Sequence, residues 1–553
     1  MTDQRGAVAE RVAGVPQWAR DAVGYEVYIR SYADADGDGV GDLPGLLARL
    51  DHLVELGVDI VWVTPFYPSP MLDEGYDVAD YTDIAPVYGS LADVDALVAA
   101  VHERGLRLIV DLVPNHSSSQ HAWFRAARSS RSDPHRDYYL WRDPAPDGGP
   151  PNNWVSHFGG SAWTLDEGTG QYWLHLFLPE QPDLNWANPA VAEEFDQILS
   201  FWLERGVDGF RIDVAHALVK HPDLPDQPVA PVPEEVDPDL GSSASIWETL
   251  EHPYDSDQPD VVEIYRRWRR IADRYDALLL GEVYLLEPER LARYLAGDGL
   301  HMAFWFAPLQ AETWRPAQLR ALLAQGVEVT LSSPGEVAWV QGSHDRSRAV
   351  GRYGGGDLGR ARALALAAVE VFLPGTAFLY QGEELGLDNP ALDPVDMRDP
   401  IAVRAGEVAR TRDVARTPMP WSPGKGFGFT SAARPWMPYG GRDAADTAQV
   451  QAADPASWLS AHRRLLATRR ALRPLADAAF RWLEAGEDGI AFCRGEVVVA
   501  ANAGDREITL ALDEPLTVRF ATDRTLEGAR VSALTLAPSQ AVVLTPGAPG
   551  HDE

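Results

Sequence analysis

The sequence contains a single cysteine, Cys493, so it cannot form an intrachain disulfide bond. It also has no apolar run approaching the roughly 18 residues that a membrane-spanning helix needs. Its first twenty residues lack the apolar segment typical of a signal peptide. These absences argue against a disulfide-rich secreted scaffold and against an integral membrane protein. We therefore expect a cytoplasmic protein, in which a free thiol stays reduced.

Basic residues are scarce relative to acidic ones. The chain has 48 lysines and arginines against 82 aspartates and glutamates, which gives a formal net charge of −34. Nucleic acids and anionic membranes are recognised through lysine and arginine, so this balance argues against both as partners. The simplest interpretation of the excess acidic residues is a solvated surface.

The sequence does contain a repeated alternation of short apolar runs and amphipathic stretches. Continuous runs of β-branched and aromatic residues are typical of buried parallel strands, and amphipathic stretches such as 91–104 and 191–204 follow them. Eight such units favour an α/β fold, a (β/α)8 TIM barrel. A doubly wound sheet would need a nucleotide-type glycine loop, which we do not find. The expected strands are 23–32, 59–66, 107–113, 209–214, 277–284, 302–306, 338–343 and 376–381.

Two irregular stretches interrupt the alternation. Residues 117–180 are rich in proline, glycine, tryptophan and histidine, and they are too long for a simple loop, which predicts a small inserted domain after the third strand. Residues 387–451 predict a second covering segment. After a helix over 457–472, short strands indicate a C-terminal antiparallel β domain. The predicted organisation is a barrel (1–116 and 181–474), an inserted domain (117–180) and a C-terminal β-sandwich (475–553).

Acidic residues follow three of the predicted strands. Asp213 ends the fourth run, Glu282 closes the fifth, and Asp345 follows the seventh. Because the carboxyl ends of barrel strands meet at one mouth, we expect these acids to converge in one pocket. Arg211 lies two residues before Asp213, on the same side of a strand, and its charge would keep Asp213 ionised. The apolar run before Glu282 would favour the protonated form of that acid.

One ionised and one protonated carboxyl group, roughly 5–5.5 Å apart, are what a retaining glycosidase requires. The segments that carry such groups here are Asp-Leu-Val-Pro-Asn-His (111–116), Gly-Phe-Arg-Ile-Asp-Val-Ala-His (209–216), Gly-Glu-Val-Tyr (281–284) and Ser-His-Asp (343–345). They resemble motifs of the α-amylase superfamily of glycoside hydrolases, in its α-glucosidase and oligo-1,6-glucosidase group, and the resemblance covers nearly the whole chain.

The resemblance implies a role for each of these residues. Asp213 matches the nucleophile, Glu282 the general acid/base, and Asp345 the third acid, which binds sugar hydroxyls. His116 and His344 match two histidines that bind hydroxyls of the glucose in the −1 subsite. Asp111 is expected to support the hydrogen-bond network of the site rather than to contact sugar.

Further residues are expected to shape the glucose pocket. In the family, the tyrosine of Gly-Tyr-Asp (75–77) stacks on the −1 sugar and the aspartate binds a non-reducing-end hydroxyl. These roles, taken by Tyr76 and Asp77, suit an aromatic face and a carboxylate acceptor. Arg416 matches the arginine that pairs with that aspartate and closes the pocket behind one glucose, which would make the enzyme exo-acting. Phe158 and Phe177 are expected to line the entrance.

Carboxylates alternate with small residues in the loop after the first predicted strand. Alternate oxygen ligands suit Ca²⁺, but position twelve of the loop is Gly45 rather than glutamate, which argues against an EF-hand. Relatives carry a structural Ca²⁺ at the matching loop, which Mg²⁺ could replace, and a solvated acidic turn is the alternative. The expected ligands are Asp34, Asp36, Asp38, Val40 and Asp42.

Taken together, the residues and the resemblance predict a retaining, exo-acting α-glucosidase that cleaves short α-glucosides and needs no organic cofactor. Val214 follows the nucleophile, and valine there accompanies α-1,6 activity in relatives, but the following Ala215-His216 differs from their usual continuation. Both α-1,4 and α-1,6 linkages therefore stay open. A glucosyl transferase or isomerase, such as a trehalose synthase or isomaltulose synthase, is the alternative within the family. A catalytically inactive transporter heavy chain is disfavoured, because all three acids are present.

Overall fold

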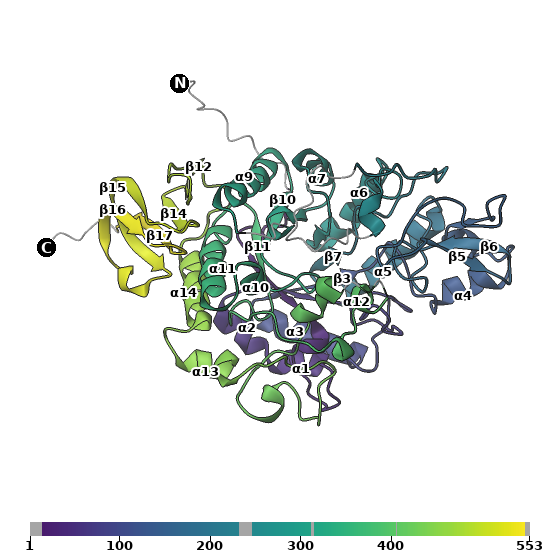
Figure 1. Cartoon of the computed structure of the whole chain (residues 1–553), viewed down its shortest axis with the longest axis horizontal. Coiled ribbons are helices and arrows are strands. Elements are labelled where there is room, and N and C mark those ends of the chain that lie inside the picture. The colour runs from purple at the N-terminus through teal and green to yellow at the C-terminus, as the bar shows by residue number, and fades with distance from the viewer. Residues whose placement is uncertain (1–13, 232–245, 311–313, 405, 407, 548–553) are drawn as a thin grey trace, which may run out of the picture.

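Eight parallel strands close into a barrel at the centre of the molecule, as Figure 1 shows. The computed structural model describes residues 14–231, 246–310, 314–404, 406 and 408–547; the predicted outer ends of the barrel and of the C-terminal domain lie outside the described residues. The predicted TIM barrel is confirmed. Its strands, in the order β1-β11-β10-β9-β8-β7-β3-β2, are β1 (Val23–Val27), β2 (Ile60–Val63), β3 (Arg107–Leu112), β7 (Gly209–Ile212), β8 (Leu278–Gly281), β9 (Met302–Trp305), β10 (Glu336–Val340) and β11 (Thr376–Tyr380).

Helices surround the barrel and bury its outer face. Alternate strand residues, such as Tyr25 and Val27 of β1, pack in the shell between strands and helices. The helix starts follow capping rules: Ser90 and Asp93 form a capping box at α3, and Asn188 caps α5. The surrounding helices are α1 (Leu43–Ala48), α2 (Leu50–Leu56), α3 (Leu91–Glu103), α5 (Pro189–Glu204), α6 (Val261–Ala272), α7 (Pro288–Tyr294), α8 (Ala307–Gln310), α9 (Pro316–Ser332), α10 (Ala349–Arg352), α11 (Gly356–Glu370) and α14 (Trp458–Ala471).

The barrel interior holds a second, separate apolar cluster, and polar side chains lie above it. The cluster includes Trp62 of β2, Leu280 of β8 and Phe304 of β9. Neighbouring strands set the register of the polar residues, because Asp111 of β3 lies directly beside Arg211 of β7. The pleat therefore directs these charged side chains to the inside of the barrel, toward the carboxyl ends of the strands.

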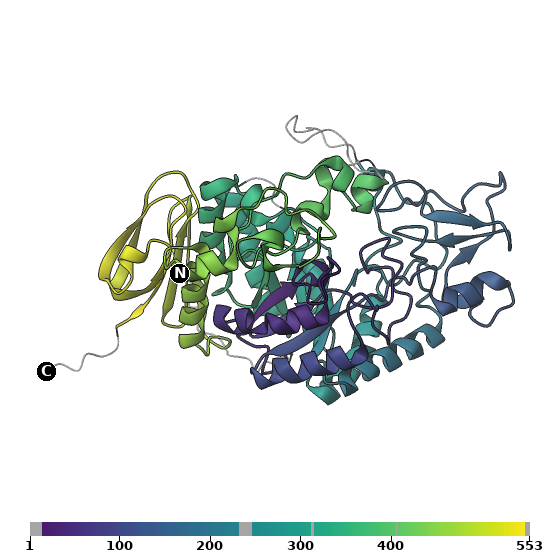
Figure 2. The same ribbon diagram turned by 90° about the horizontal axis from the view of Figure 1, so that it is seen from below.

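The segment between β3 and α5 forms a small lobe at one end of the molecule (Figures 1 and 2). It contains α4 (Ala122–Ser129) and a three-stranded antiparallel sheet in the order β4-β6-β5, made of β4 (Trp141–Arg142), β5 (Trp163–Asp166) and β6 (Gln171–Leu174). The irregular stretch 387–451 contains α12 (Pro400–Val403) and α13 (Ala448–Ala453). It reaches the lobe through Arg404, whose Nη2 lies 3.1 Å from Oε2 of Glu180.

The C-terminal strands form one sheet at the opposite end of the molecule (Figure 2). The described strands pair in the order β12-β13-β14-β17-β15-β16. One face of this sheet, including Phe492, joins the large cluster around the barrel, where α11 packs against it. The opposite face buries a cluster of its own, which includes Val542 and Leu544. The strands are β12 (Phe480–Trp482), β13 (Gly489–Arg494), β14 (Val497–Asn502), β15 (Ile508–Ala521), β16 (Arg530–Leu536) and β17 (Ala541–Pro546).

Short 3-10 helices occupy many of the connections. None of the helices in the described ranges combines the length and the apolar character that crossing a membrane requires. The 3-10 helices are η1 (Ile29–Ser31), η2 (Arg136–Tyr138), η3 (Ile246–Thr249), η4 (Asp273–Tyr275), η5 (Pro394–Asp396), η6 (Val408–Arg410), η7 (Arg412–Ala415), η8 (Lys425–Gly428), η9 (Ala444–Asp446) and η10 (Arg524–Leu526).

Candidate active site

A cavity of about 430 Å³ opens at the carboxyl ends of the barrel strands, between the barrel, the small lobe and the stretch 387–451. Its location is where barrel enzymes carry their active sites. It brings together the three predicted acids and several of the predicted subsite residues. The cavity is lined by Asp73, Tyr76, His116, His157, Phe158, Phe177, Asp213, Val214, His216, Trp247, Glu248, Glu282, Tyr284, Gln310, Asp345, Arg346, Ile401, Arg410 and Arg412.

Arg211 holds two of the three acids. Its Nη1 lies 2.7 Å from Oδ1 of Asp213, and its Nη2 lies 2.9 Å from Oε2 of Glu282. Nη1 also lies 2.7 Å from Oδ1 of Asp111, which in turn accepts a hydrogen bond from the indole of Trp62 at 2.9 Å. Asp111 therefore belongs to the supporting network, as the sequence predicts.

The backbone after Asp213 contributes to the same cluster. Val214 has a φ of 43°, which is strained for a β-branched residue. This conformation directs its backbone N–H to Oε2 of Glu282, at 2.9 Å. The surrounding packing holds this strained conformation in place. In it, the N–H group of Val214 is a second fixed donor to the predicted general acid, besides Arg211.

The protonation of the two acids differs from the expectation. Burial raises the pKa of Asp213 well above its usual value, although the Arg211 cation opposes it. Burial also raises the pKa of Glu282, and Arg211 opposes this shift without cancelling it. Arg211 was expected to keep Asp213 ionised, but burial outweighs this cation, and the guanidinium contacts Glu282 as well. Two buried carboxyl groups near enough to hydrogen bond each other retain one proton between them.

Asp345 lies in the opposite electrostatic environment. Burial alone would raise its pKa, but the neighbouring His344, Arg412 and Arg416 lower the pKa of Asp345 below its ordinary range. Nη1 of Arg412 and Nη2 of Arg416 lie 3.0 Å and 2.9 Å from Oδ1 of this carboxylate. Asp345 therefore stays ionised in the free protein.

One end of the cavity is closed by an ion cluster around Arg412, at the start of η7. Nη2 of this arginine lies 3.0 Å from Oδ1 of Asp73 and 2.8 Å from Oδ1 of Asp399. Together with its contact to Asp345, Arg412 links three carboxylates from three separate segments. The guanidinium also lies 5.4 Å from the ring centre of Phe158.

The predicted pairing of Asp77 with Arg416 is wrong. The side chain of Asp77 is buried beneath its own loop, where it accepts from Ser69 Oγ at 2.7 Å and from Leu72 N at 3.0 Å. Arg416 instead donates through Nε to the carbonyl of His344 at 2.9 Å and pairs with Asp345. Asp73 and Arg412, each four residues earlier in the chain, take the places expected for Asp77 and Arg416.

The remaining predicted subsite residues lie around the same cavity. A φ of 111° at Gly75 turns the chain so that Tyr76 enters the site, where its ring stacks on His344 at a centroid distance of 5.3 Å. Burial lowers the pKa of His116 to about 4, so this histidine is neutral. The ring of Phe177 lies 5.1 Å from His116 and 5.8 Å from Phe158, and both phenylalanines line the cavity.

Sequence reasoning missed Asp73, Arg412 and the aromatic wall formed by His157 and Trp247. The ring of His157 stacks at 3.5 Å on Trp247 and at 4.7 Å on Phe177. Asp73 could have been predicted, because it lies three residues before Tyr76 in the same loop. His157 and Trp247 come from irregular segments without strand or helix periodicity, which gave no such signal.

The acidic loop after β1 gathers three carboxylates. Oxygens of Asp34, Asp36 and Asp42 all lie within 4.8 Å of one another, which fits the hard oxygen ligands of a divalent cation. Asp42 also caps α1. Asp38 and Val40, the other two expected ligands, are joined by a hydrogen bond of 2.7 Å from Val40 N to Asp38 Oδ1. Asp38 does not belong to the group of three.

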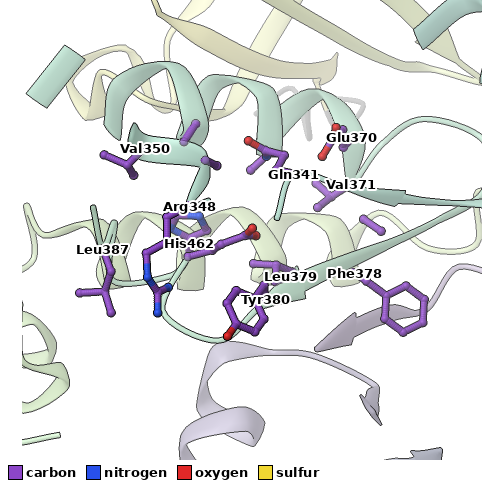
Figure 3. A pocket seen from close by; sticks show the side chains of 15 residues that line it. Gln341, Arg348, Val350, Glu370, Val371, Phe378, Leu379, Tyr380, Leu387 and His462 are labelled. Atoms are coloured by element: carbon purple, nitrogen blue, oxygen red, sulfur yellow. The ribbon is translucent and has the colours of Figure 1, made fainter. Parts of the chain in front are cut away.

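A second, much smaller cavity of about 30 Å³ lies behind β11, against α11 and α14 (Figure 3). The carboxyl groups of Glu370 and Glu383 line it, beside Gln341 and Arg348. Burial raises the pKa of Glu370 well above its usual value and that of Glu383 to about 8. This cavity holds none of the residues predicted for the site.

Comparison with known proteins places this geometry in a family. A family model described as the alpha-amylase catalytic domain matches residues 26–478. A Rhizobium meliloti (strain 1021) protein named "Probable alpha-glucosidase" is 41% identical over 483 residues, which cover 86% of this chain and 87% of that protein. The oligo-1,6-glucosidase of Parageobacillus thermoglucosidasius is 36% identical over 487 residues, covering 82% and 84% of the two chains. The crystal structure of the alpha-glucosyl transfer enzyme XgtA superposes with a TM-score of 0.88 at 36% identity, covering 96% and 99%.

Proposed function

Because the chain belongs to the α-amylase family of glycoside hydrolases, we propose that it is a retaining, exo-acting α-glucosidase that releases α-glucose from the non-reducing end of short α-glucosides. The observation that carries this proposal is the contact of Arg211 with both Asp213 and Glu282. One guanidinium holds the two carboxyl groups near enough for a hydrogen bond between them. An inverting enzyme would instead keep them roughly 6.5–9.5 Å apart, to leave room for a water molecule.

The proposed reaction has two steps. In the first, the carboxylate of Asp213 attacks the anomeric carbon while Glu282 gives its proton to the glycosidic oxygen, so the bond to the leaving sugar breaks and a glucosyl ester forms. In the second, Glu282 takes a proton from water, whose oxygen displaces Asp213 from the same carbon. The first step requires the proton of the buried pair to lie on Glu282, so that Asp213 is ionised when it attacks. Two displacements at one carbon return the α anomer.

The closed end of the cavity supports exo action. Arg412 bridges Asp73 and Asp345, and we propose that this bridge stands behind the terminal glucose and excludes a longer chain on that side. An ionised carboxylate and a guanidinium are acceptor and donor partners for the hydroxyls of one terminal glucose. Phe158 and Tyr76 offer flat apolar surfaces beside them.

Linkage preference is proposed from the residue next to the nucleophile. The side chain of Val214 lines the cavity where the leaving sugar would lie. Valine at this position accompanies α-1,6 activity in relatives, and we propose the same preference here, in keeping with the similarity to an oligo-1,6-glucosidase. Comparing kcat/KM for isomaltose and maltose tests this assignment, and a preference for maltose would contradict it.

A glucosyl transferase or isomerase is the second candidate, because the structural neighbour XgtA is described as an alpha-glucosyl transfer enzyme. Such an enzyme would keep the same two-step chemistry and pass glucose to a sugar hydroxyl instead of water. Incubation with sucrose or maltose separates the two: hydrolysis yields free glucose, whereas transfer or isomerisation yields new disaccharides or trisaccharides.

We also propose that the acidic loop binds a structural Ca²⁺, which Mg²⁺ could replace, through Asp34, Asp36, Asp42 and the remaining expected ligands Asp38 and Val40. The convergence of three carboxylates supports this assignment. The loop follows β1 and lies outside the residues that line the cavity, so the ion would stabilise the fold rather than take part in the reaction.

We propose cytoplasmic action on small oligosaccharides, which suits a chain with one cysteine.

The exo assignment is tested with p-nitrophenyl α-maltotrioside as substrate. An exo-acting α-glucosidase removes glucose first and leaves p-nitrophenyl α-maltoside, which chromatography resolves. Early release of maltose or maltotriose would instead require the chain to pass the closed end, and it would contradict the proposal.

A further inference from the structure

Glu26 is a buried carboxyl group inside the barrel for which the proposed reaction gives no role. Its neighbours in β1, Tyr25 and Val27, pack outward against the helices, so the pleat points Glu26 inward. Its residue surface is only 1% exposed. Oε1 of Glu26 lies 2.5 Å from Nδ1 of His344 and 3.3 Å from the backbone N of the same residue. A buried acid in so short a contact needs a chemical explanation.

The ring of His344 is held in one plane. It stacks between Tyr28 and Tyr76, at centroid distances of 5.6 Å and 5.3 Å and with interplanar angles of 18° and 10°. The edge of Trp62 approaches at 6.1 Å. Packing on both faces fixes the tilt of the ring, but it leaves open which of the two nitrogens carries the hydrogen.

The contacts of the two nitrogens decide where that hydrogen lies. Nε2 of His344 lies 3.2 Å from Oδ2 of Asp345, whose pKa is lowered by its cationic neighbours, but this nitrogen is buried and makes no hydrogen bond in the free protein. A lone pair on Nε2 would face this carboxylate, so the electrostatics favour the tautomer that carries its hydrogen on Nε2. Burial lowers the pKa of His344 well below its usual value, which leaves the ring neutral and Nδ1 without a hydrogen.

A bare Nδ1 can make its short contact with Glu26 only if the carboxyl group supplies the hydrogen. Burial in the barrel interior raises the pKa of Glu26 well above its usual value, and Arg211 only partly opposes this. The protonated form of Glu26 is therefore consistent with its burial and with the need of Nδ1 of His344 for a hydrogen-bond donor.

We propose that Glu26 is a positioning residue, whose protonated carboxyl group donates to Nδ1 of His344 and fixes this ring in the tautomer that carries its hydrogen on Nε2. The inference rests on the proposed function in one respect, because it gives that hydrogen a use. In the glucosidase reaction, Nε2–H and the carboxylate of Asp345 form an adjacent donor and acceptor for the hydroxyls of the −1 glucose. With the other tautomer, a lone pair of Nε2 would face that carboxylate and no donor would remain.

The tautomer can be measured in the free protein without any turnover. The protein is labelled with ¹⁵N-histidine, and long-range proton–nitrogen spectra are recorded for its 14 histidines, with His344 assigned from the spectrum of a His344→Asn variant. We expect a pyrrole-type shift for Nε2 and a pyridine-type shift for Nδ1 of His344 at neutral pH. A protonated Nδ1, or a fully charged ring, would overturn the proposal, whatever the substrate of the enzyme is.

Two variants link the tautomer to turnover. Glu26→Gln keeps a donor for Nδ1, so we expect the wild-type tautomer and kcat within about threefold of wild type. Glu26→Leu removes the donor, and we expect kcat to fall roughly 10- to 100-fold, with KM changing less, as for the loss of one preorganised donor. An unchanged kcat and an unchanged tautomer in Glu26→Leu would contradict the positioning role. If Glu26→Leu fails to fold, the spectrum of the wild type and of Glu26→Gln still decides.

Discussion

Nη2 of Arg211 lies 2.9 Å from Oε2 of Glu282, on the same guanidinium that holds Asp213. This arginine therefore sets the distance between the predicted nucleophile and the predicted general acid, rather than the charge of one of them. The contact requires both terminal nitrogens of a planar fork, which lysine cannot reproduce.

Replacing the guanidinium of Arg211 tests whether it positions Asp213 and Glu282. We expect Arg211→Lys to lower kcat roughly 10²- to 10³-fold, because a single ammonium group cannot bind Asp111, Asp213 and Glu282 in the same geometry. Initial rates on a p-nitrophenyl α-glucoside measure the effect, with thermal unfolding to confirm that the variant is folded. A variant with near wild-type kcat would show that the fork does not organise the acids.

The barrel was predictable because each strand repeats one physical pattern. Runs such as 302–306 are continuously apolar, and strand ends in a barrel necessarily meet, so Asp213, Glu282 and Asp345 could be brought together from sequence alone. The closed end of the cavity was not predictable in the same way. Arg412 begins the short 3-10 helix η7 and Arg416 caps it, and only the fold shows that Arg412 reaches Asp73.

The proton distribution was also beyond the sequence. Arg211 was expected to keep Asp213 ionised, since their spacing places the two side chains on the same side of a strand, and no pattern in the sequence pointed to Glu282. Its contact with Glu282 depends on how β7 and β8 sit side by side, which places Arg211 next to Leu280 of the neighbouring strand. The role of Glu26 depends in the same way on a contact across the barrel, 318 residues away in sequence.

Arg412 and Arg410 form a matched pair for testing the closed end. Arg412 links three carboxylates, so we expect Arg412→Lys to lower kcat/KM for a disaccharide roughly 100-fold. Arg410 also lines the cavity, and its Nη2 lies 3.2 Å from an exposed carboxylate of Glu248. Because exposed ion pairs contribute about 0–1 kcal/mol, we expect Arg410→Lys to stay within about fivefold of wild type. Equal losses in both variants would contradict the assignment of Arg412 to the glucose end.

Calcium is expected to change the stability of the protein and not its chemistry. A ligand that binds only the folded state raises the melting temperature in proportion to the logarithm of its concentration. We expect CaCl2 to raise Tm over an EDTA-treated sample, and Asp36→Asn to abolish the difference, while kcat at moderate temperature is unchanged. The Tm of both samples is measured by calorimetry. Identical Tm values with CaCl2 and EDTA would favour the solvated acidic turn instead.

The small cavity in Figure 3 predicts an unusual dependence of stability on pH. Burial raises the pKa of Glu383 from 4.5 to about 8, so the folded state holds a proton that the unfolded state releases above about pH 4.5. The stability contributed by this proton is therefore lost as the pH rises between these two values. We expect Glu383→Gln to raise Tm at pH 8 and to change it little at pH 4.5. An equal change in Tm at both pH values would show that Glu383 is not protonated in the folded protein.

We propose that Asp213 and Glu282 carry out a retaining hydrolysis. The most direct measurement follows maltose and isomaltose by proton NMR during turnover, before the anomers of glucose equilibrate. We predict that α-glucose appears first from the non-reducing unit and that Asp213→Asn abolishes its release. First appearance of β-glucose from that unit would contradict it, because inversion needs a water molecule between two acids that Arg211 holds together.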